Sequence, residues 1–116
     1  MLIRIDPASP APLFEQVAAS VRRAIADGGV APGDRLPGAR DLAASLDLNV
    51  HTVLRGYQLL REEGLIELRR GRGAVVVADG GRRGRLQEVV RALVVEARRL
   101  GVSTDELVTL VTKEMG

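Results

Sequence analysis

The sequence predicts a mainly α-helical protein with one small β-hairpin, followed by a tail of two helices. Apolar residues recur at helical spacing in five segments, and glycines or capping residues bound these segments. One short stretch instead alternates apolar and polar residues on either side of a glycine-containing turn, as in a hairpin. With 116 residues, 46% of them hydrophobic, the chain can form one packed domain and an accessory element.

The first predicted helix begins at about Pro12 and ends before Gly28-Gly29. Arg22 falls mainly on the side of this helix opposite the apolar stripe, which suggests a solvent-exposed position. The stripe consists of Leu13, Val17, Val21 and Ile25. The following "VAPGDRLP" (30–37) has two prolines and a glycine and predicts an extended connection.

Two further helices follow at short spacing. The second is predicted over 39–46 with Gly38 at its cap position, where glycine serves less well than serine. Asn49 is a good cap for the third, which runs from Val50 to about Glu63 and ends at Gly64.

The hairpin is predicted from "LIELRRGRGAVVVA". Strand-like residues at 66–69 and 74–77 flank a turn at 70–73. The resulting order is helix, helix, short turn, helix, hairpin. This is the order of a winged helix-turn-helix, in which the third helix enters the major groove of DNA.

The C-terminal part is predicted as a hinge and a helical tail. "ADGGRRG" (78–84) has three glycines and predicts a flexible connection, so we expect a winged domain at 1–78, a hinge at 79–85 and a tail at 86–116. Ser103 and Glu106 predict the start of the last helix. We expect the apolar residues of the tail to form a dimer interface, with its fold-back onto the winged domain as the alternative. They are Leu86, Val89, Val90, Leu93, Val94, Ala97, Leu100, Leu107, Leu110 and Val111.

The third helix places the only histidine of the chain, His51, on its polar side. At 100° per residue, the core side holds Val50, Val53, Gly56, Tyr57 and Leu60, and the opposite side holds His51, Arg55, Gln58 and Glu62. This phase argues against a core histidine. It leaves a DNA-groove contact, which we favour, or an exposed residue without a role. Gly56 on the core side indicates either close packing of a neighbouring helix or tolerated drift.

Positive charge is concentrated around the hairpin and the predicted hinge. The net charge is only +2, yet six arginines and a single acid, Asp79, lie between Arg69 and Arg85. Clustered arginine suits contacts with phosphate or guanine. A solvated loop that binds nothing is the alternative.

Several classes of protein are disfavoured by composition. The chain has no cysteine and one histidine, so we expect no metal and no cofactor. The sequence has no nucleophile and base at the spacing of a catalytic site, so we do not expect an enzyme. No signal peptide or apolar run of about 20 residues is present, so we expect a cytoplasmic protein without membrane contact.

Residues 12–76 resemble the DNA-binding domain of the GntR family of bacterial transcriptional regulators. The motifs "PLFEQ", "PGDRLP", "RDLA" and "EEGLIELRRGRGAVV" occur in register, and "LNVHTVLRGYQLL" is most similar to the YtrA-type branch. That branch carries a short two-helix tail, which agrees with the length of this chain. This sequence differs from the family pattern at two places, and both bear on which operator sequence it would bind. Gly38-Ala39 replaces a Ser-containing pair common in the family, and Ala74 replaces a threonine.

The resemblance implies roles for individual residues. Arg40 matches the arginine of the second helix that contacts DNA, and Arg35 would either touch the DNA backbone or brace the domain. Tyr57 would be mainly a core residue whose hydroxyl could reach a phosphate. Asn49, His51, Thr52 and Arg55 match positions at the start and outer face of the recognition helix, and Arg70, Gly71 and Arg72 match the wing tip that reaches the minor groove.

From the residues and the resemblance together we expect a homodimeric repressor that binds double-stranded DNA at a palindromic operator. Its relatives often control transporter operons, and an unidentified small-molecule effector is compatible with the sequence. Two alternatives are a non-specific nucleic-acid-binding protein, suggested by "RRGRG", and a dimerisation adaptor that keeps the fold without binding DNA.

Overall fold

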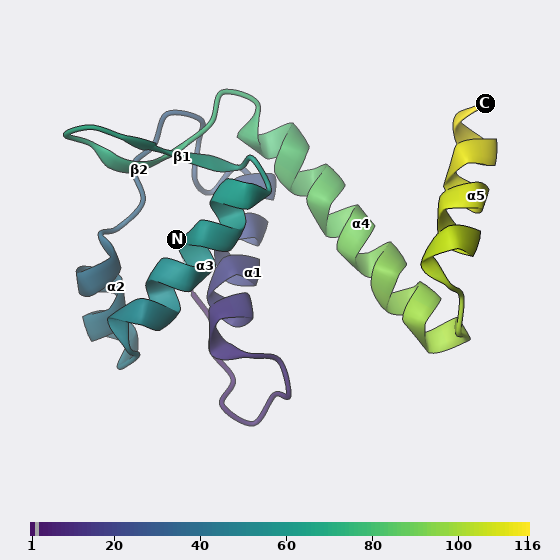
Figure 1. Ribbon diagram of the computed structural model, residues 1–116. Coiled ribbons are helices and arrows are strands. Elements are labelled where there is room, and N and C mark those ends of the chain that lie inside the picture. Colours follow the sequence, from purple (N-terminus) through teal and green to yellow (C-terminus); the bar gives the residue numbers. More distant parts are fainter. Residues whose placement is uncertain (2) are drawn as a thin grey trace. The chain divides into compact units, whose positions relative to one another are not determined.

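The computed structural model describes residue 1 and residues 3–116, and it confirms the predicted fold class. Contacts divide the chain into two units, Met1–Leu86 and Gln87–Gly116. The described part of the chain contains α1 (Leu13–Ala26), α2 (Ala39–Leu46), α3 (Val50–Glu62), β1 (Ile66–Arg69), β2 (Gly73–Val76), α4 (Gly80–Leu100) and α5 (Thr104–Met115) (Figure 1).

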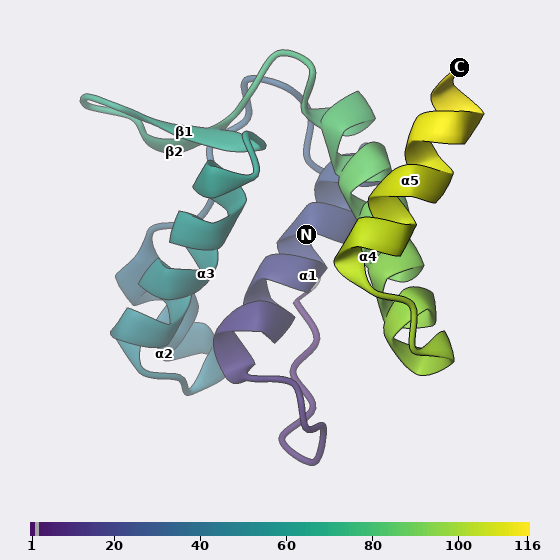
Figure 2. The ribbon, with the colours of Figure 1, turned by 45° about the vertical axis from the view of Figure 1, so that its right-hand side comes forward.

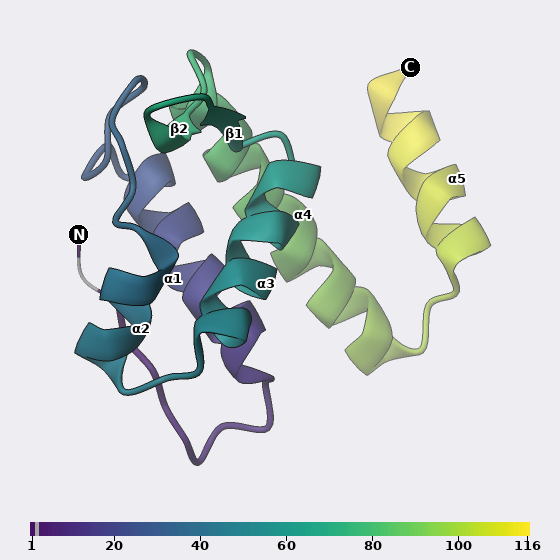
Figure 3. The same ribbon diagram turned by 60° about the vertical axis from the view of Figure 1, so that its left-hand side comes forward.

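The core of the first unit lies among α1, α2 and α3. Both α1 and α2 contact α3, and α1 runs beside α3 in all three views (Figures 1, 2 and 3). Aliphatic side chains fill the space between them, and five are completely buried: Val17, Ala18 and Val21 of α1, and Val53 and Leu60 of α3. Burying such side chains is the main favourable contribution to folding.

Gly56 allows α1 and α3 to approach each other closely. A Cβ atom at this position would lie 3.0 Å from the backbone oxygen of Phe14 and 3.1 Å from a methyl group of Val17. The predicted close packing is therefore confirmed, and it brings the first turn of α1 next to the middle of α3.

Strands β1 and β2 form an antiparallel hairpin beyond the C-terminal end of α3 (Figure 2). Ile66 pairs with Val76, and Arg69 pairs with Gly73 at the end of the hairpin. The connection between α1 and α2 lies against β2, because the backbone of Leu36 donates to the carbonyl of Ala74 at 2.9 Å. The hairpin is the wing of a winged helix-turn-helix, and it is anchored to the three-helix core at its base.

Arg22 differs from the sequence-based expectation because it is buried. Its side chain is 3% exposed and forms a bidentate ion pair with Glu63, with nitrogen–oxygen distances of 2.8 and 2.9 Å. A buried guanidinium needs such a partner, since an unpaired charge in the interior is very unfavourable. The pair fastens α1 to the residue that follows α3.

The segment 79–85 was expected to be a hinge, but it is helical from Gly80 onward, so the predicted loop is wrong. Its glycines permit packing instead. A Cβ atom on Gly80 would lie 2.6 Å from Val76, and one on Gly84 would lie 3.2 Å from the backbone nitrogen of Ala26. The first turns of α4 therefore pack closely against the end of α1 and against β2.

The second unit contains the rest of α4 and all of α5. Gly101 has a φ of 71° and ends α4, and the Ser103 hydroxyl caps α5 by accepting from the backbone of Glu106 at 3.2 Å, as expected. Most predicted interface residues are exposed: Leu86, Val89, Val90, Leu93, Leu100, Leu110 and Val111. Ala97 is buried within the chain, contrary to expectation. Its backbone carbonyl accepts from the backbone nitrogen of Val102 at 2.9 Å, at the turn that ends α4.

Among the described residues, none of the helices combines the length and the apolar character that crossing a lipid bilayer requires.

Candidate nucleic-acid interface

Helix α3 presents one polar, exposed face and one buried face, in the predicted phase. His51, Arg55 and Gln58 are exposed. The opposite face is buried and consists of Val53, Gly56, Tyr57 and Leu60. Since one side is fixed in the core, the side chains on the other side are held at defined positions along a rigid helix.

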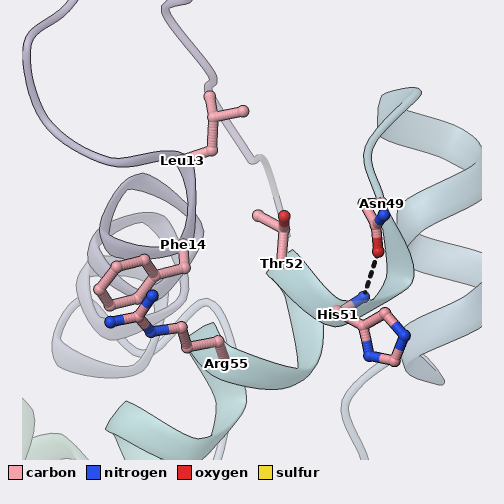
Figure 4. A pocket seen from close by; sticks show the side chains of 6 residues that line it. All are labelled: Leu13, Phe14, Asn49, His51, Thr52 and Arg55. Carbon is pink, nitrogen blue, oxygen red and sulfur yellow. Dashed lines mark hydrogen bonds between the residues drawn. The ribbon is translucent and has the colours of Figure 1, made fainter.

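The start of α3 is capped by Asn49. Its side-chain oxygen accepts a hydrogen bond from the backbone nitrogen of His51 at 2.8 Å (Figure 4). This bond satisfies one of the free N–H groups at the helix start. Asn49 therefore has a structural function at the N-terminus of α3, and its amide group lies beside the exposed residues that the sequence assigns to DNA.

Arg55 is stacked on an aromatic ring. Its guanidinium carbon lies 3.8 Å from the centroid of the Phe14 ring, which comes from the first turn of α1 (Figure 4). This is the geometry of a cation–π contact. Phe14 was not among the site residues predicted from the sequence. The signal was the single phenylalanine of an otherwise aliphatic chain, placed in the first turn of its helix.

A shallow recess of about 450 Å³ lies between the N-terminal ends of α1 and α3. In Figure 4 the His51 ring points away from the Arg55–Phe14 pair, and Thr52 lies between them. The recess thus separates two exposed polar groups on the same helix. Its lining consists of Leu13, Phe14, Asn49, His51, Thr52 and Arg55.

The wing presents exposed arginines around a tight turn. Gly71 and Gly73 have φ values of 79° and 76°, which glycine adopts without strain. Arg70 and Arg72 are exposed beside them, and Arg72 donates to the carbonyl of Gly33 at 3.2 Å. This bond connects the end of the wing to the loop between α1 and α2.

Arg35 and Arg40 are also exposed on the first unit. The backbone of Arg35 pairs with Val75 of β2, so its side chain starts from the edge of the wing. Arg40 lies in the first turn of α2. The structure thus distributes the predicted arginines over α2, α3, the wing and the loop beside it.

Tyr57 differs from the other predicted contact residues because its hydroxyl is already used inside the protein. The side chain is 7% exposed, and its hydroxyl donates to the carbonyl of Pro37 at 2.7 Å. Burial raises the pKa of Tyr57 to about 12. A phenol has one proton to donate, so a phosphate contact would require this bond to break. Tyr57 is a core residue that joins α3 to the loop before α2.

Within the described residues, no group of three or more histidine, cysteine, aspartate or glutamate side chains could hold a metal ion.

A three-helix core with a basic wing and a polar recognition helix defines the class of winged helix-turn-helix DNA-binding proteins. Comparison with known proteins identifies the family. The profile described as "Bacterial regulatory proteins, gntR family" matches residues 13–76. The chain belongs to the GntR family and is a DNA-binding transcriptional regulator.

Relatives of similar length place the chain in the YtrA-type branch. It is 33% identical to the HTH-type transcriptional repressor YtrA of Bacillus subtilis, over 91% of this chain and 86% of that protein. It is 32% identical to the solved structure of YtrA from Sulfolobus acidocaldarius, with a TM-score of 0.63 and coverage of 97% and 96% of the two chains. A GntR family regulator from Listeria monocytogenes has 26% identity, covers 94% and 98%, and gives a TM-score of 0.63.

Proposed function

We propose that this protein is a homodimeric repressor that binds a palindromic operator through α3 and the wing. The observation that carries the proposal is the exposed polar face of α3, held rigidly by a buried opposite face and accompanied by the arginine-bearing wing. A helix of this kind fits the major groove, where base edges can be distinguished. The repressor role is supported by the name of the Bacillus subtilis relative.

Base contacts are assigned to the start and outer face of α3. His51 and Thr52 lie in the first turn of α3, Arg55 lies about one turn later, and Asn49 lies at the cap. Arg55 is suited to guanine, because a guanidinium can donate to both O6 and N7 of that base. The exposed Leu54 beside this face could contact only a thymine methyl group.

Phosphate contacts are assigned to the remaining arginines of the first unit. Arg40, Arg70 and Arg72 are exposed. We assign Arg40 to the DNA backbone, and Arg70 and Arg72 with Gly71 to the minor groove. Arg35 is assigned to the backbone beside the wing. These contacts carry the salt-dependent part of the affinity. A solved structural neighbour with 19% identity, BusR of S. agalactiae, is in complex with its busAB-promotor DNA. At this identity it supports the fold alone.

Dimerisation is assigned to the apolar residues of the tail. Seven of the ten predicted interface residues are exposed, and Leu86, Val89 and Leu100 each expose more than 60% of their surface. Val94 and Leu107 are half-buried. Several exposed apolar residues that recur along a helix are typical of an interaction site. A two-fold pair of chains would match a palindromic operator, and an effector would bind between the tails. Control of a transporter operon is proposed from the family resemblance.

The experiment begins by selecting duplexes from randomised DNA with the wild-type protein. A repressor selects a palindrome and prefers it to bulk DNA by about a thousand-fold or more. Selection without any consensus would instead support non-specific nucleic-acid binding, which the exposed arginines of the wing favour. Absence of salt-dependent binding would support a dimerisation adaptor.

Arg55→Ala then tests the assignment of α3. We expect the variant to bind the selected operator about 1–3 kcal/mol more weakly and to lose the base preference at one position of each half-site. Arg61→Ala is the matched control, because Arg61 is exposed on α3 but outside the proposed reading face. Unchanged affinity and preference in Arg55→Ala would refute the assignment.

A further inference from the structure

We propose that Phe14 is a positioning residue that sets the orientation of the Arg55 guanidinium and thereby the base preference of α3. This inference rests on the proposed function, because it concerns a residue that acts through Arg55 on DNA. Phe14 itself comes from α1, outside the recognition helix.

The guanidinium of Arg55 lies 3.8 Å from the centre of the Phe14 ring, and Arg55 is otherwise exposed (Figure 4). An exposed arginine normally samples many rotamers, and ordering it on DNA costs conformational entropy. Stacking on a ring restricts these rotamers before DNA arrives. It occupies the flat face of the guanidinium and leaves the N–H edges available to donate.

Phe14 is half-buried in the first turn of α1. Its backbone oxygen lies 3.0 Å from the position of a Cβ atom on Gly56, the residue that follows Arg55. The two helices therefore approach each other closely next to the stacked pair. Ring and guanidinium are carried by two packed helices, which fixes their relative position more firmly than a loop could.

A guanidinium contacts guanine specifically only when its N–H groups point at O6 and N7 together. A phosphate contact is less demanding, since positive charge near the backbone is sufficient. Loss of the ring should therefore reduce the preference for one base pair, while the salt dependence of binding stays unchanged.

The experiment uses the full-length chain and the duplex that the wild-type protein selects from randomised DNA. Dissociation constants are measured for that duplex and for each single base-pair change in one half-site. Phe14→Leu keeps an apolar side chain and removes the aromatic face. We expect the discrimination at one position to fall by about two- to five-fold, as the loss of an exposed cation–π contact implies. The same position should be the one affected by Arg55→Lys, which keeps the charge and removes the planar fork.

Three controls separate orientation from folding. Phe14→Tyr restores an aromatic face and should restore the discrimination. Leu13→Ala changes the neighbouring residue of the same recess and should leave the discrimination between base pairs unaltered. In the Arg55→Lys background, Phe14→Leu should cause no further loss at that position. Phe14→Met provides the same test with a flexible apolar side chain if Phe14→Leu does not fold.

The outcomes distinguish this inference from the proposed function. If the wild-type protein shows no base preference, the proposed function fails. If it does, and the folded Phe14 variants discriminate as well as the wild type, the positioning role of Phe14 is refuted while the repressor assignment stands. An equal loss at every position, or a failure of Phe14→Tyr to restore discrimination, would make Phe14 a purely structural residue and would also overturn the inference.

Discussion

At the scale of single residues, some polar side chains are buried and make contacts inside the protein that their sequence positions do not predict. Arg22 lies one residue after Val21, and its helical phase indicates the polar side of α1. It is buried nevertheless, because Glu63 meets it from a position 41 residues further along the chain. Helical phase describes one helix at a time and contains no information about such a distant partner. The exposed positions of His51 and Arg55 could be predicted because the buried side of α3 is continuously apolar.

Tyr57→Phe tests the internal role of the tyrosine hydroxyl. The variant loses the 2.7 Å hydrogen bond to Pro37, so we expect its free energy of unfolding at pH 8 to be lower by about 1 kcal/mol. Denaturant unfolding measures this difference. Retention of operator preference in the variant would agree with a core role, and a selective loss of operator affinity would instead indicate a DNA contact.

The same residue predicts a dependence of stability on alkaline pH. Burial raises the pKa of Tyr57 to about 12, whereas an unfolded tyrosine titrates near 10. Between these values the folded chain holds the proton more strongly. The stabilisation is therefore complete below pH 10 and is lost as the pH rises toward 12. From pH 9 to pH 11 the free energy of unfolding of the wild type should fall by about 1 kcal/mol more than that of Tyr57→Phe. Parallel unfolding curves over this range would contradict the assigned shift.

At the scale of elements, the sequence predicts the helices of the first unit well and the start of α4 poorly. Gly38 and Asn49 occupy the predicted cap positions of α2 and α3. The glycines of 78–84 suggested a flexible connection, because glycine is typical of loops. In the structure Gly80 and Gly84 instead allow a helix to pack against Val76 and Ala26. Composition alone does not distinguish a glycine needed for flexibility from one needed for close packing, since only the neighbouring element decides.

Gly80→Ala and Gly81→Ala form a matched pair that tests this packing. A Cβ atom on Gly80 would lie 2.6 Å from buried Val76, so we expect a loss of about 1–3 kcal/mol through overpacking. A Cβ atom on Gly81 would meet only the backbone oxygen of Ile25 at 3.8 Å. Alanine there should stabilise the helix by about 0.5 kcal/mol. Thermal unfolding of both variants is the measurement. Equal, small increases in the thermal stability of both variants would support the original interpretation of this segment as a flexible hinge.

The wing is an element whose contribution can be measured separately from base recognition. Arg70 and Arg72 are exposed at its turn. We expect the double variant Arg70→Ala/Arg72→Ala to reduce the salt slope of operator binding by about two per half-site, with the preferred sequence unchanged. Arg98→Ala, on the exposed surface of α4, is the control for removal of charge elsewhere. If the wing variant and the control have the wild-type slope, the wing makes no contact with phosphates.

At the scale of the whole molecule, the two units differ in how completely they bury their apolar residues. The first unit encloses Val17, Val21, Val53 and Leu60 entirely, whereas α5 in the second unit has no buried residue. Apolar periodicity predicted both sets, because it reports which residues share a face. It does not report what covers that face. In the first unit, other elements of the same chain bury the apolar face. For the tail, we propose that a second copy of the chain buries it.

Leu93→Glu tests this proposal, since Leu93 lies at the centre of the predicted stripe of α4 and is 40% exposed. Burying a leucine side chain contributes about 1.5–3 kcal/mol, and a charge in the same interface would be unfavourable. Sedimentation should therefore show a dimer for the wild type and a monomer for the variant. Val95→Glu is the matched control, because Val95 is exposed about 200° further around the same helix and should leave the dimer intact. The monomeric variant should keep its affinity for an isolated half-site and lose the additional affinity of the full palindrome, because the second half-site would no longer be bound by a tethered partner. A wild-type protein that sediments as a monomer, or a Leu93→Glu variant that remains dimeric, would refute the assignment of this face.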